Sequence, residues 1–188
     1  MSASIDATRS PLPLLRGERV ALRAPRDGDQ ADLFALFSSS QVVRYWSVPA
    51  WTDLAQADEW LTRQQGFHES GTGLTWAIAH HDDDALIGTV SLHAFMPEQA
   101  RAEIGYTLHP AQWGHGLASE AVRLALRHAF EGMALRRIEA DADPRNTASC
   151  RLLERLGFQH EGSLRERWLV AGELQDSAIY GLLRGELR

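Results

Sequence analysis

Apolar residues recur along this chain at two spacings, one typical of strands and the other typical of helices. Strands are predicted over residues 20–23, 74–79, 85–93, 100–108, 135–142, 158–169 and 176–183. Helices are predicted over residues 27–37, 53–67, 116–132 and 143–156. The resulting order is one strand, two helices, three strands, then helix, strand, helix and two strands. This order predicts a mixed α/β domain built on one central sheet.

Turn and capping residues mark several of these boundaries. Asp143 followed by Pro144 predicts the start of the last helix, because a carboxylate can cap free N–H groups and proline tolerates the first turn. Gly157 predicts the end of that helix, since glycine favours the left-handed conformation that often closes a helix. The polar run over residues 80–84 predicts a hairpin turn between two strands.

Composition places the chain among ordinary globular proteins. It has 188 residues, of which 44% are apolar and 23% charged, which suits one domain and excludes collagen-like, low-complexity and disulfide-rich classes. We expect a disordered lead over residues 1–12 and one domain over residues 13–188. The net charge of −6 argues against a broad nucleic-acid surface. Cys150 is the single cysteine, so an intramolecular disulfide is excluded.

The apolar runs and the histidines narrow the class further. Residues 1–15 lack the apolar core of a signal peptide. No apolar run approaches the length of about 20 residues that a membrane helix needs. We therefore expect a cytoplasmic protein without membrane or nucleic-acid partners. The eight histidines form none of the spacings typical of metal sites, so we expect no metal.

The most informative stretch covers residues 103–121, EIGYTLHPAQWGHGLASEA. It predicts a strand, a tight turn with glycines at 114 and 116, and then a helix. Glycines let a ligand approach the backbone closely, and a helix start offers unpaired N–H groups and partial positive charge. This arrangement can hold a pyrophosphate. An ordinary strand-to-helix turn explains the same residues equally well.

Two blocks of the sequence resemble the GNAT family of N-acetyltransferases. The run from Trp113 to Ala118, WGHGLA, is similar to the acetyl-CoA loop of that family, except that Trp113 stands where Gln or Arg is usual. The run from Asn146 to Phe158 is similar to the Asn-x-x-Ser…Gly-Phe helix of the branch that acetylates ribosomal-protein N-termini. The resemblance covers about residues 15–184. It implies a mixed, mostly antiparallel sheet, flanked by helices and opened into a V-shaped cleft.

The resemblance also implies how acetyl-CoA, the cosubstrate, is held. The cleft lies between the strand over residues 100–108 and the strand over residues 135–142. The pantetheine arm would meet the strand backbone near Thr107, Leu108 and His109. The pyrophosphate would meet the loop and helix start formed by Trp113, Gly114, His115, Gly116, Leu117, Ala118 and Ser119. Asn146 would contact the pantetheine from the other side, although asparagine also caps helices.

The chemistry implied is direct attack of an amine on a thioester, which needs a base and a proton donor. By resemblance, Glu103 is the candidate base; its alternatives are a solvent-facing role or a pair with Arg101. Ser149 is the candidate donor to the departing thiolate, and its alternative is a helix-surface serine. Leu153 stands where a neighbouring branch carries a tyrosine donor, and leucine cannot donate a proton.

The acceptor is an amine whose identity stays open. Trp46, Trp51 and Trp168 are candidates for the walls of the acceptor groove, with packing as the alternative for the first two. The acceptor expected is a primary amine, such as the N-terminus of a ribosomal protein. The alternatives are a small-molecule amine, namely an antibiotic, an amino acid or a polyamine, and a CoA-binding regulator without turnover. A homodimer is a further expectation from the resemblance.

Overall fold

The computed structural model describes residues 11–170 and 172–188. The expectation of a disordered lead over residues 1–12 therefore falls almost entirely outside the described residues. Leu12 packs against the apolar core, and the carbonyl of Pro13 accepts a hydrogen bond of 2.9 Å from the indole N–H of Trp76. In the described part of the chain, no helix is long and apolar enough to cross a membrane.

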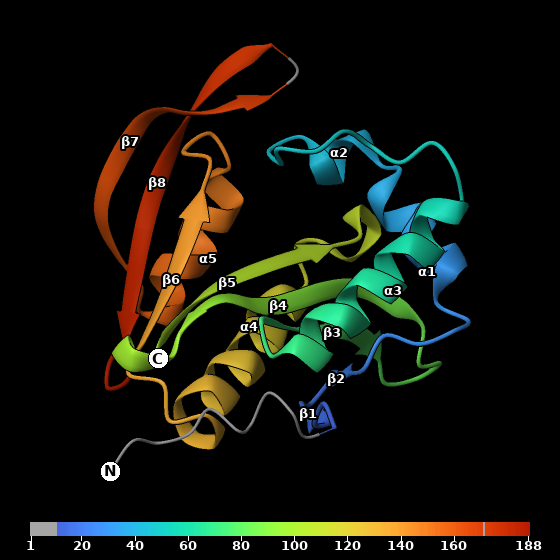
Figure 1. Cartoon of the computed structure of the whole chain (residues 1–188), viewed down its shortest axis with the longest axis horizontal. Helices are drawn as coiled ribbons and strands as arrows, with labels where there is room; N and C mark the ends of the chain where they lie inside the picture. The colour runs from blue at the N-terminus through green and yellow to red at the C-terminus, as the bar shows by residue number, and fades with distance from the viewer. Residues whose placement is uncertain (1–10, 171) are drawn as a thin grey trace.

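One mixed sheet organises the described residues, and its strands run in the order β1-β2-β3-β4-β5-β6-β8-β7 (Figure 1). Neighbouring strands of the sheet are antiparallel, except for β5 and β6, which run parallel. The strands are β1 (Leu15–Arg16), β2 (Val20–Arg23), β3 (Gly73–His80), β4 (Leu86–Met96), β5 (Arg101–Leu108), β6 (Arg137–Ala142), β7 (Gln159–Val170) and β8 (Glu173–Leu183). The predicted mixed, mostly antiparallel sheet is confirmed.

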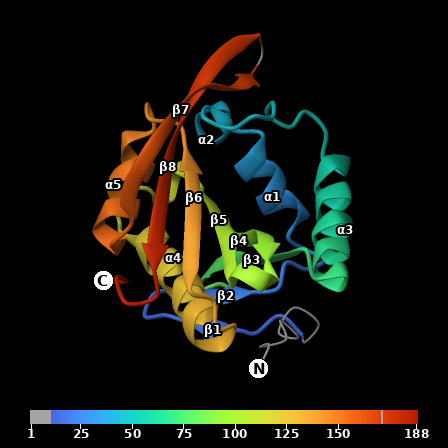
Figure 2. The same ribbon diagram turned by 60° about the vertical axis from the view of Figure 1, so that its left-hand side comes forward.

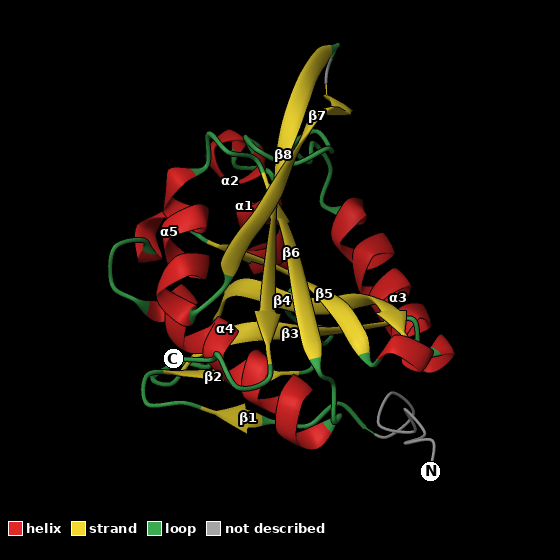
Figure 3. Ribbon diagram, turned by 90° about the vertical axis from the view of Figure 1, so that its left-hand side faces the viewer, coloured by secondary structure: helices red, strands yellow, loops and turns green. Residues whose placement is uncertain are grey.

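Helices cover both faces of this sheet (Figures 2 and 3). They are α1 (Gln30–Phe37), α2 (Ser40–Val43), α3 (Ala55–Ser70), α4 (Leu117–Arg127) and α5 (Thr147–Leu156). On β3, Trp76 belongs to the apolar cluster with α4 and α5, whereas its neighbour Ala77 belongs to the cluster with α1 and α3. Because successive strand residues point to opposite faces, this division identifies the face that carries each side chain.

Several boundaries differ from the sequence predictions because side chains have partners elsewhere. Helix α1 begins at Gln30 rather than at residue 27. Asp29 does not cap it, since its carboxylate forms two hydrogen bonds of 2.8 Å with the buried guanidinium of Arg23. Helix α4 ends at Arg127 and a π-helical turn over His128–Gly132 follows, so the predicted helix over residues 116–132 is not one regular helix.

The start of α5 was predicted wrongly. The helix begins at Thr147, not at the Asp143-Pro144 pair. The carboxylate of Asp143 instead accepts hydrogen bonds from the backbone N–H (2.8 Å) and the guanidinium (2.9 Å) of Arg145. Asn146 is the cap, because its side-chain oxygen accepts a hydrogen bond of 3.2 Å from the Ser149 N–H. The capping alternative for Asn146 is therefore realised, while its side-chain NH₂ remains able to donate.

The two central strands separate part-way along their length. Strands β5 and β6 pair only where residues 101–103 face residues 137–139. Beyond that point β5 stays with β4 as far as Leu108, and β6 stays with β8 as far as Ala142. The strands therefore diverge into a V, and among the described residues no strand pairs with the inner edge of β5 there. We call this opening the β5–β6 gap.

Candidate functional site

The register of β4 and β5 decides which backbone groups face the β5–β6 gap. The N–H of His109 donates to the Ile87 carbonyl of β4 at 2.8 Å. In an antiparallel pair, residues bonded to the partner alternate with residues that point away. The backbone N–H and C=O of Thr107 therefore point to β4, as the N–H of His109 does. The backbone N–H and C=O groups of Tyr106 and Leu108 point into the gap instead. This corrects the expectation that the Thr107 and His109 backbone lines the cleft.

The glycine loop lies at the open end of the β5–β6 gap. The indole N–H of Trp113, the first residue of the loop, donates a hydrogen bond of 2.7 Å to the Leu108 carbonyl, which holds the loop against the end of β5. Gly114 and Gly116 have φ angles of 82° and 77°, in a region that residues with side chains rarely adopt. No atom of the described residues lies within 4 Å of the position where a Cβ on Gly114 would stand, so the loop backbone is approachable from that side.

The start of α4 offers free donors next to this loop. Gly116 is the N-cap residue and has no side chain with which to cap the helix. Within residues 11–170 and 172–188, no group accepts from the N–H of Leu117, Ala118 or Ser119. The side chain of Leu117 is buried in the core, so the backbone is what this turn exposes. His115 is exposed and contributes its backbone to the same loop. Such a helix start suits a phosphate group.

Across the β5–β6 gap, Ser149 on α5 meets a tyrosine from β5. The hydroxyl oxygens of Tyr106 and Ser149 lie 2.7 Å apart. Burial raises the pKa of Tyr106 above its ordinary value, and the hydrogen bond to Ser149 opposes this only in part. Tyr106 is therefore a protonated hydroxyl that bridges the two sides of the gap beside the capping residue Asn146.

Glu103 lies on the same face of the sheet as Ala77, the face that packs on α1 and α3, and stands opposite His93 of β4 in the strand register. The alternative pair with Arg101 is wrong, because Arg101 pairs with Glu139 of β6 instead. Part of the His93 ring reaches the surface, but crowding by neighbouring atoms lowers the pKa of His93, and the charge of Glu103 acts in the opposite direction. A carboxylate and a neutral imidazole thus lie side by side at the closed end of the gap.

The tryptophans predicted to line an acceptor groove have different surroundings. Trp46 and Trp51 are half-buried and pack on Phe37 of α1, with ring centroids 5.7 and 4.7 Å away. Trp168 is 43% exposed on β7, and its indole N–H donates to Ser177 at 3.0 Å. The β7–β8 hairpin that carries Trp168 rises beyond the body of the domain, across from α2 (Figure 1). The structure therefore places Trp46 and Trp51 in the segment between α2 and α3, and Trp168 on β7.

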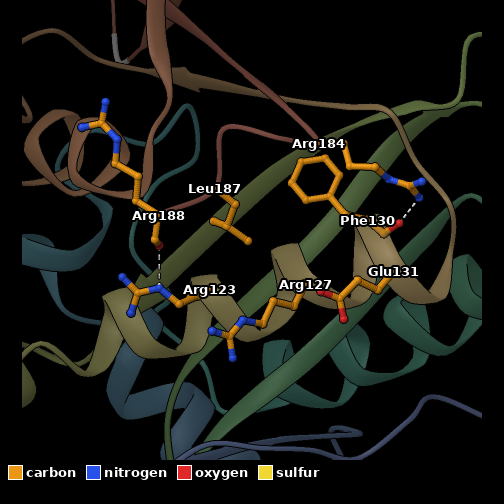
Figure 4. Close-up of a pocket in the computed structure, with 7 residues that line it drawn as sticks. All are labelled: Arg123, Arg127, Phe130, Glu131, Arg184, Leu187 and Arg188. Atoms are coloured by element: carbon orange, nitrogen blue, oxygen red, sulfur yellow. Dashed lines mark hydrogen bonds between the residues drawn. The ribbon is translucent and has the colours of Figure 1, made fainter.

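A hollow of about 400 Å³ lies between α4 and the last residues of the chain, away from the β5–β6 gap. Its lining includes Arg123, Arg127, Arg184 and Phe130. Figure 4 shows that the arginine guanidinium groups point away from one another rather than into a common centre. No predicted site residue lines this hollow. Among the described residues, no cluster of three His, Cys, Asp or Glu side chains could hold a metal ion.

The model of the acetyltransferase (GNAT) domain matches residues 19–159, which includes the loop, the β5–β6 gap and α5. The chain belongs to the GNAT acetyltransferase family. It is 34% identical to an uncharacterized N-acetyltransferase of Bacillus subtilis, YoaA, over 92% of this chain and 97% of that protein. It is 29% identical to the [ribosomal protein uS5]-alanine N-acetyltransferase of Escherichia coli, over 62% of this chain and 60% of that enzyme.

A solved structure supports the same assignment. A probable GNAT acetyltransferase from Chromobacterium violaceum matches with a TM-score of 0.84 and 29% identity, over 99% of this chain and 91% of that one. The chain therefore has the single-domain α/β GNAT fold predicted from its sequence, and it is an N-acetyltransferase. GNAT acetyltransferases use acetyl-CoA as the cosubstrate and transfer its acetyl group to an amine.

Sequence reasoning missed His93 and Tyr106 as residues of this site. The pairing of His93 with Glu103 depends on the register between β4 and β5, which alternation within either strand does not specify. Tyr106 lies inside the stretch that carried the loop argument, but its contact with Ser149 spans 43 residues. The available signal was strand alternation, which places the Tyr106 side chain on the face opposite Glu103, the face that α5 covers in the structure.

Proposed function

We propose that this chain transfers the acetyl group of acetyl-CoA to the α-amine of a protein N-terminus, with the reaction centred in the β5–β6 gap. The observation that carries the proposal is the juxtaposition of a free strand edge, a glycine loop and a helix start with unpaired N–H groups. Acetyl-CoA has amides that can pair with a strand edge and a pyrophosphate that suits a helix start.

Acetyl-CoA fits the donors and acceptors present. The pantetheine amides pair with the backbone of Tyr106 and with the N–H of Leu108, whose carbonyl is already bonded to Trp113. The pyrophosphate is held by the N–H groups of Leu117, Ala118 and Ser119, next to the exposed backbone of Gly114 and His115. The side-chain NH₂ of Asn146 donates to the pantetheine arm from α5, while its oxygen caps the helix.

Glu103 takes the proton that the acceptor amine must lose. The bound cosubstrate supplies a thioester carbonyl, and attack by the amine forms a C–N bond as the C–S bond breaks. Glu103 is free for this role because Arg101 neutralises Glu139 instead. His93 lies opposite Glu103 in the register, and crowding lowers its pKa, so its neutral ring can accept the amine proton and pass it to Glu103.

Ser149 gives a proton to the departing thiolate. A serine hydroxyl is a weak acid on its own, so its environment matters. The Tyr106 hydroxyl, 2.7 Å away, can donate to the Ser149 oxygen as the serine proton leaves. The start of α5 adds partial positive charge at the same point. The pair therefore stabilises the developing negative charge on the sulfur.

The names of relatives and the open side of the gap favour a protein N-terminus as the acceptor. One relative is named for the alanine of ribosomal protein uS5. Trp168 is exposed on β7, and Trp46 and Trp51 are half-buried against Phe37 of α1, so aromatic side chains are available to contact an acceptor. A small-molecule amine remains the second candidate, because the aromatic rings would suit a compact apolar amine equally well.

The test is an acetylation assay read by mass spectrometry. Peptides with a free N-terminal alanine or serine are compared with matched peptides whose α-amine is blocked but whose lysine is free. A panel of polyamines, amino acids and aminoglycosides is run in parallel. Acetylation confined to the free α-amine supports the proposal. Acetylation of small amines alone would transfer the function to that class, and acetyl-CoA binding without any product would indicate a regulator.

A further inference from the structure

Arg19, in the turn between β1 and β2, reaches the glycine loop from a distant part of the sequence. Its Nη1 donates a hydrogen bond of 2.7 Å to the His115 carbonyl. Its Nε donates to the carboxylate of Glu120, in the first turn of α4, at 2.9 Å. The guanidinium thus joins the loop and the helix start through two of its donors, in the forked geometry that arginine provides.

The bond to His115 fixes the direction of a peptide group. In a trans peptide, the carbonyl of one residue and the N–H of the next point in opposite directions. The His115 carbonyl faces Arg19, so the Gly116 N–H faces the other side of the loop. The outer Nη2 of Arg19 would lie 3.5 Å from a Cβ on Gly116, which confirms that the guanidinium lines that outer side.

The contact with Arg19 neutralises the negative charge of Glu120, which would otherwise repel an anion such as a pyrophosphate at the helix start. A carboxylate in the first turn of α4 places negative charge close to the helix start. Burial alone would raise the pKa of Glu120, but the backbone N–H and the guanidinium of Arg19 more than offset this and lower it. The carboxylate is therefore ionised, and Arg19 neutralises it.

The turn that presents Arg19 is shaped around this carboxylate. The N–H of Arg19 donates to Glu120 at 2.8 Å, in addition to the side-chain contact. A Cβ on Gly17 would stand 2.5 Å from the Glu120 oxygen and 2.9 Å from the Val20 carbonyl, so only glycine fits there without a shift. The turn over residues 17–20 therefore packs closely against the Glu120 carboxylate.

The loop itself carries no strong cation. Residues 113–119, WGHGLAS, contain neither Lys nor Arg. We infer that Arg19 is a positioning residue of the cosubstrate site: it orients the Gly116 N–H toward the pyrophosphate and offsets the charge of Glu120. This inference rests on the proposed binding of acetyl-CoA by the loop, and it adds a residue from outside that loop to the site.

The test compares two thioesters that differ in the pyrophosphate. Wild type, Arg19→Gln and the control Arg16→Gln are assayed with acetyl-CoA and with acetyl-pantetheine, which lacks the nucleotide and pyrophosphate. Arg16 is an exposed neighbour on β1 whose backbone pairs with Ala21 of β2. For Arg19→Gln we expect kcat/KM with acetyl-CoA to fall about tenfold, which corresponds to about 1.4 kcal/mol. With acetyl-pantetheine, and in Arg16→Gln, kcat/KM should not change.

An unchanged kcat/KM with acetyl-CoA in Arg19→Gln would overturn the inference. An equal loss with both thioesters would also overturn it, because Arg19 would then act only on the fold. Arg19→Lys retains the charge but not the fork, so it should fall between wild type and Arg19→Gln, and it serves as the test if Arg19→Gln does not fold. If wild type itself used both thioesters equally well, the proposed pyrophosphate site would fail, independently of Arg19.

Discussion

Removal of the Tyr106 hydroxyl gives a sharp test of the proposed proton donor. Tyr106→Phe deletes a hydrogen bond in which the two oxygens lie 2.7 Å apart. Such a bond contributes about 1 kcal/mol net, and an enclosed partner left unsatisfied adds to the loss. We therefore expect a destabilisation of about 1–2 kcal/mol, which lowers Tm by roughly 2 to 8 °C in a chain of this size.

The effect on catalysis should pass through Ser149. If Tyr106 contributes about 1.4 kcal/mol to the transition state, Tyr106→Phe lowers kcat about tenfold and leaves the KM for acetyl-CoA unchanged. Ser149→Ala should lower kcat by roughly a hundredfold. Because both residues act on one proton, the double variant should be no slower than Ser149→Ala alone.

A double-mutant cycle, measured as kcat at saturating acetyl-CoA, checks this reasoning. Thr147→Ala is the matched control, because it removes an exposed hydroxyl from the same turn of α5. Burial holds the pKa of Tyr106 above its ordinary value, so the tyrosine stays protonated and should add no alkaline limb to the rate profile below pH 10. Additive losses in the double variant, or an unchanged kcat in Tyr106→Phe, would refute the pair.

Three further predictions concern the base and the fold. Glu103→Gln should lower kcat at least tenfold with little change in acetyl-CoA binding, as a rate profile from pH 5.5 to 9 and a binding titration would check. In the wild type, protonation of His93 should reduce the rate as the pH falls, and because crowding lowers the pKa of His93 this reduction should come below the ordinary pKa of histidine. His93→Gln should make the reduction smaller, and a pH profile identical to that of the wild type would exclude His93 from the proton transfer. Asp29→Asn should cost about 2–3 kcal/mol, because it weakens two charge-assisted hydrogen bonds while Arg23 keeps its pair with Asp84, measured by urea unfolding against exposed Asp27→Asn.

Much of the fold follows from local patterns, as β2 and α4 illustrate. The strand over residues 20–23 has its predicted bounds, and the apolar stripe of α4 faces the core. The turn with two positive-φ glycines was also predictable, because few other residues adopt that conformation without strain. These features depend on neighbouring residues only, which is why alternation and glycine spacing identify them.

Features that depend on distant partners could not be predicted in this way. Asp143-Pro144 is a sound helix start by local rules, but Arg145 takes the carboxylate and Asn146 caps α5 instead. The backbone direction of Thr107 depends on the register with β4, and a shift of one residue would reverse it. The bond between Arg19 and His115 spans 96 residues and leaves no local signal.

The central claim is that the glycine loop and the β5–β6 gap bind acetyl-CoA. The most direct measurement is thermal unfolding of the wild-type chain with acetyl-CoA, CoA or ATP as a nucleotide control. Acetyl-CoA at 100 times its Kd should stabilise the fold by about 2.7 kcal/mol, which raises Tm by roughly 5 to 10 °C. We expect this rise with acetyl-CoA and CoA and a smaller one with ATP. An unchanged Tm with acetyl-CoA at millimolar concentration would contradict the account.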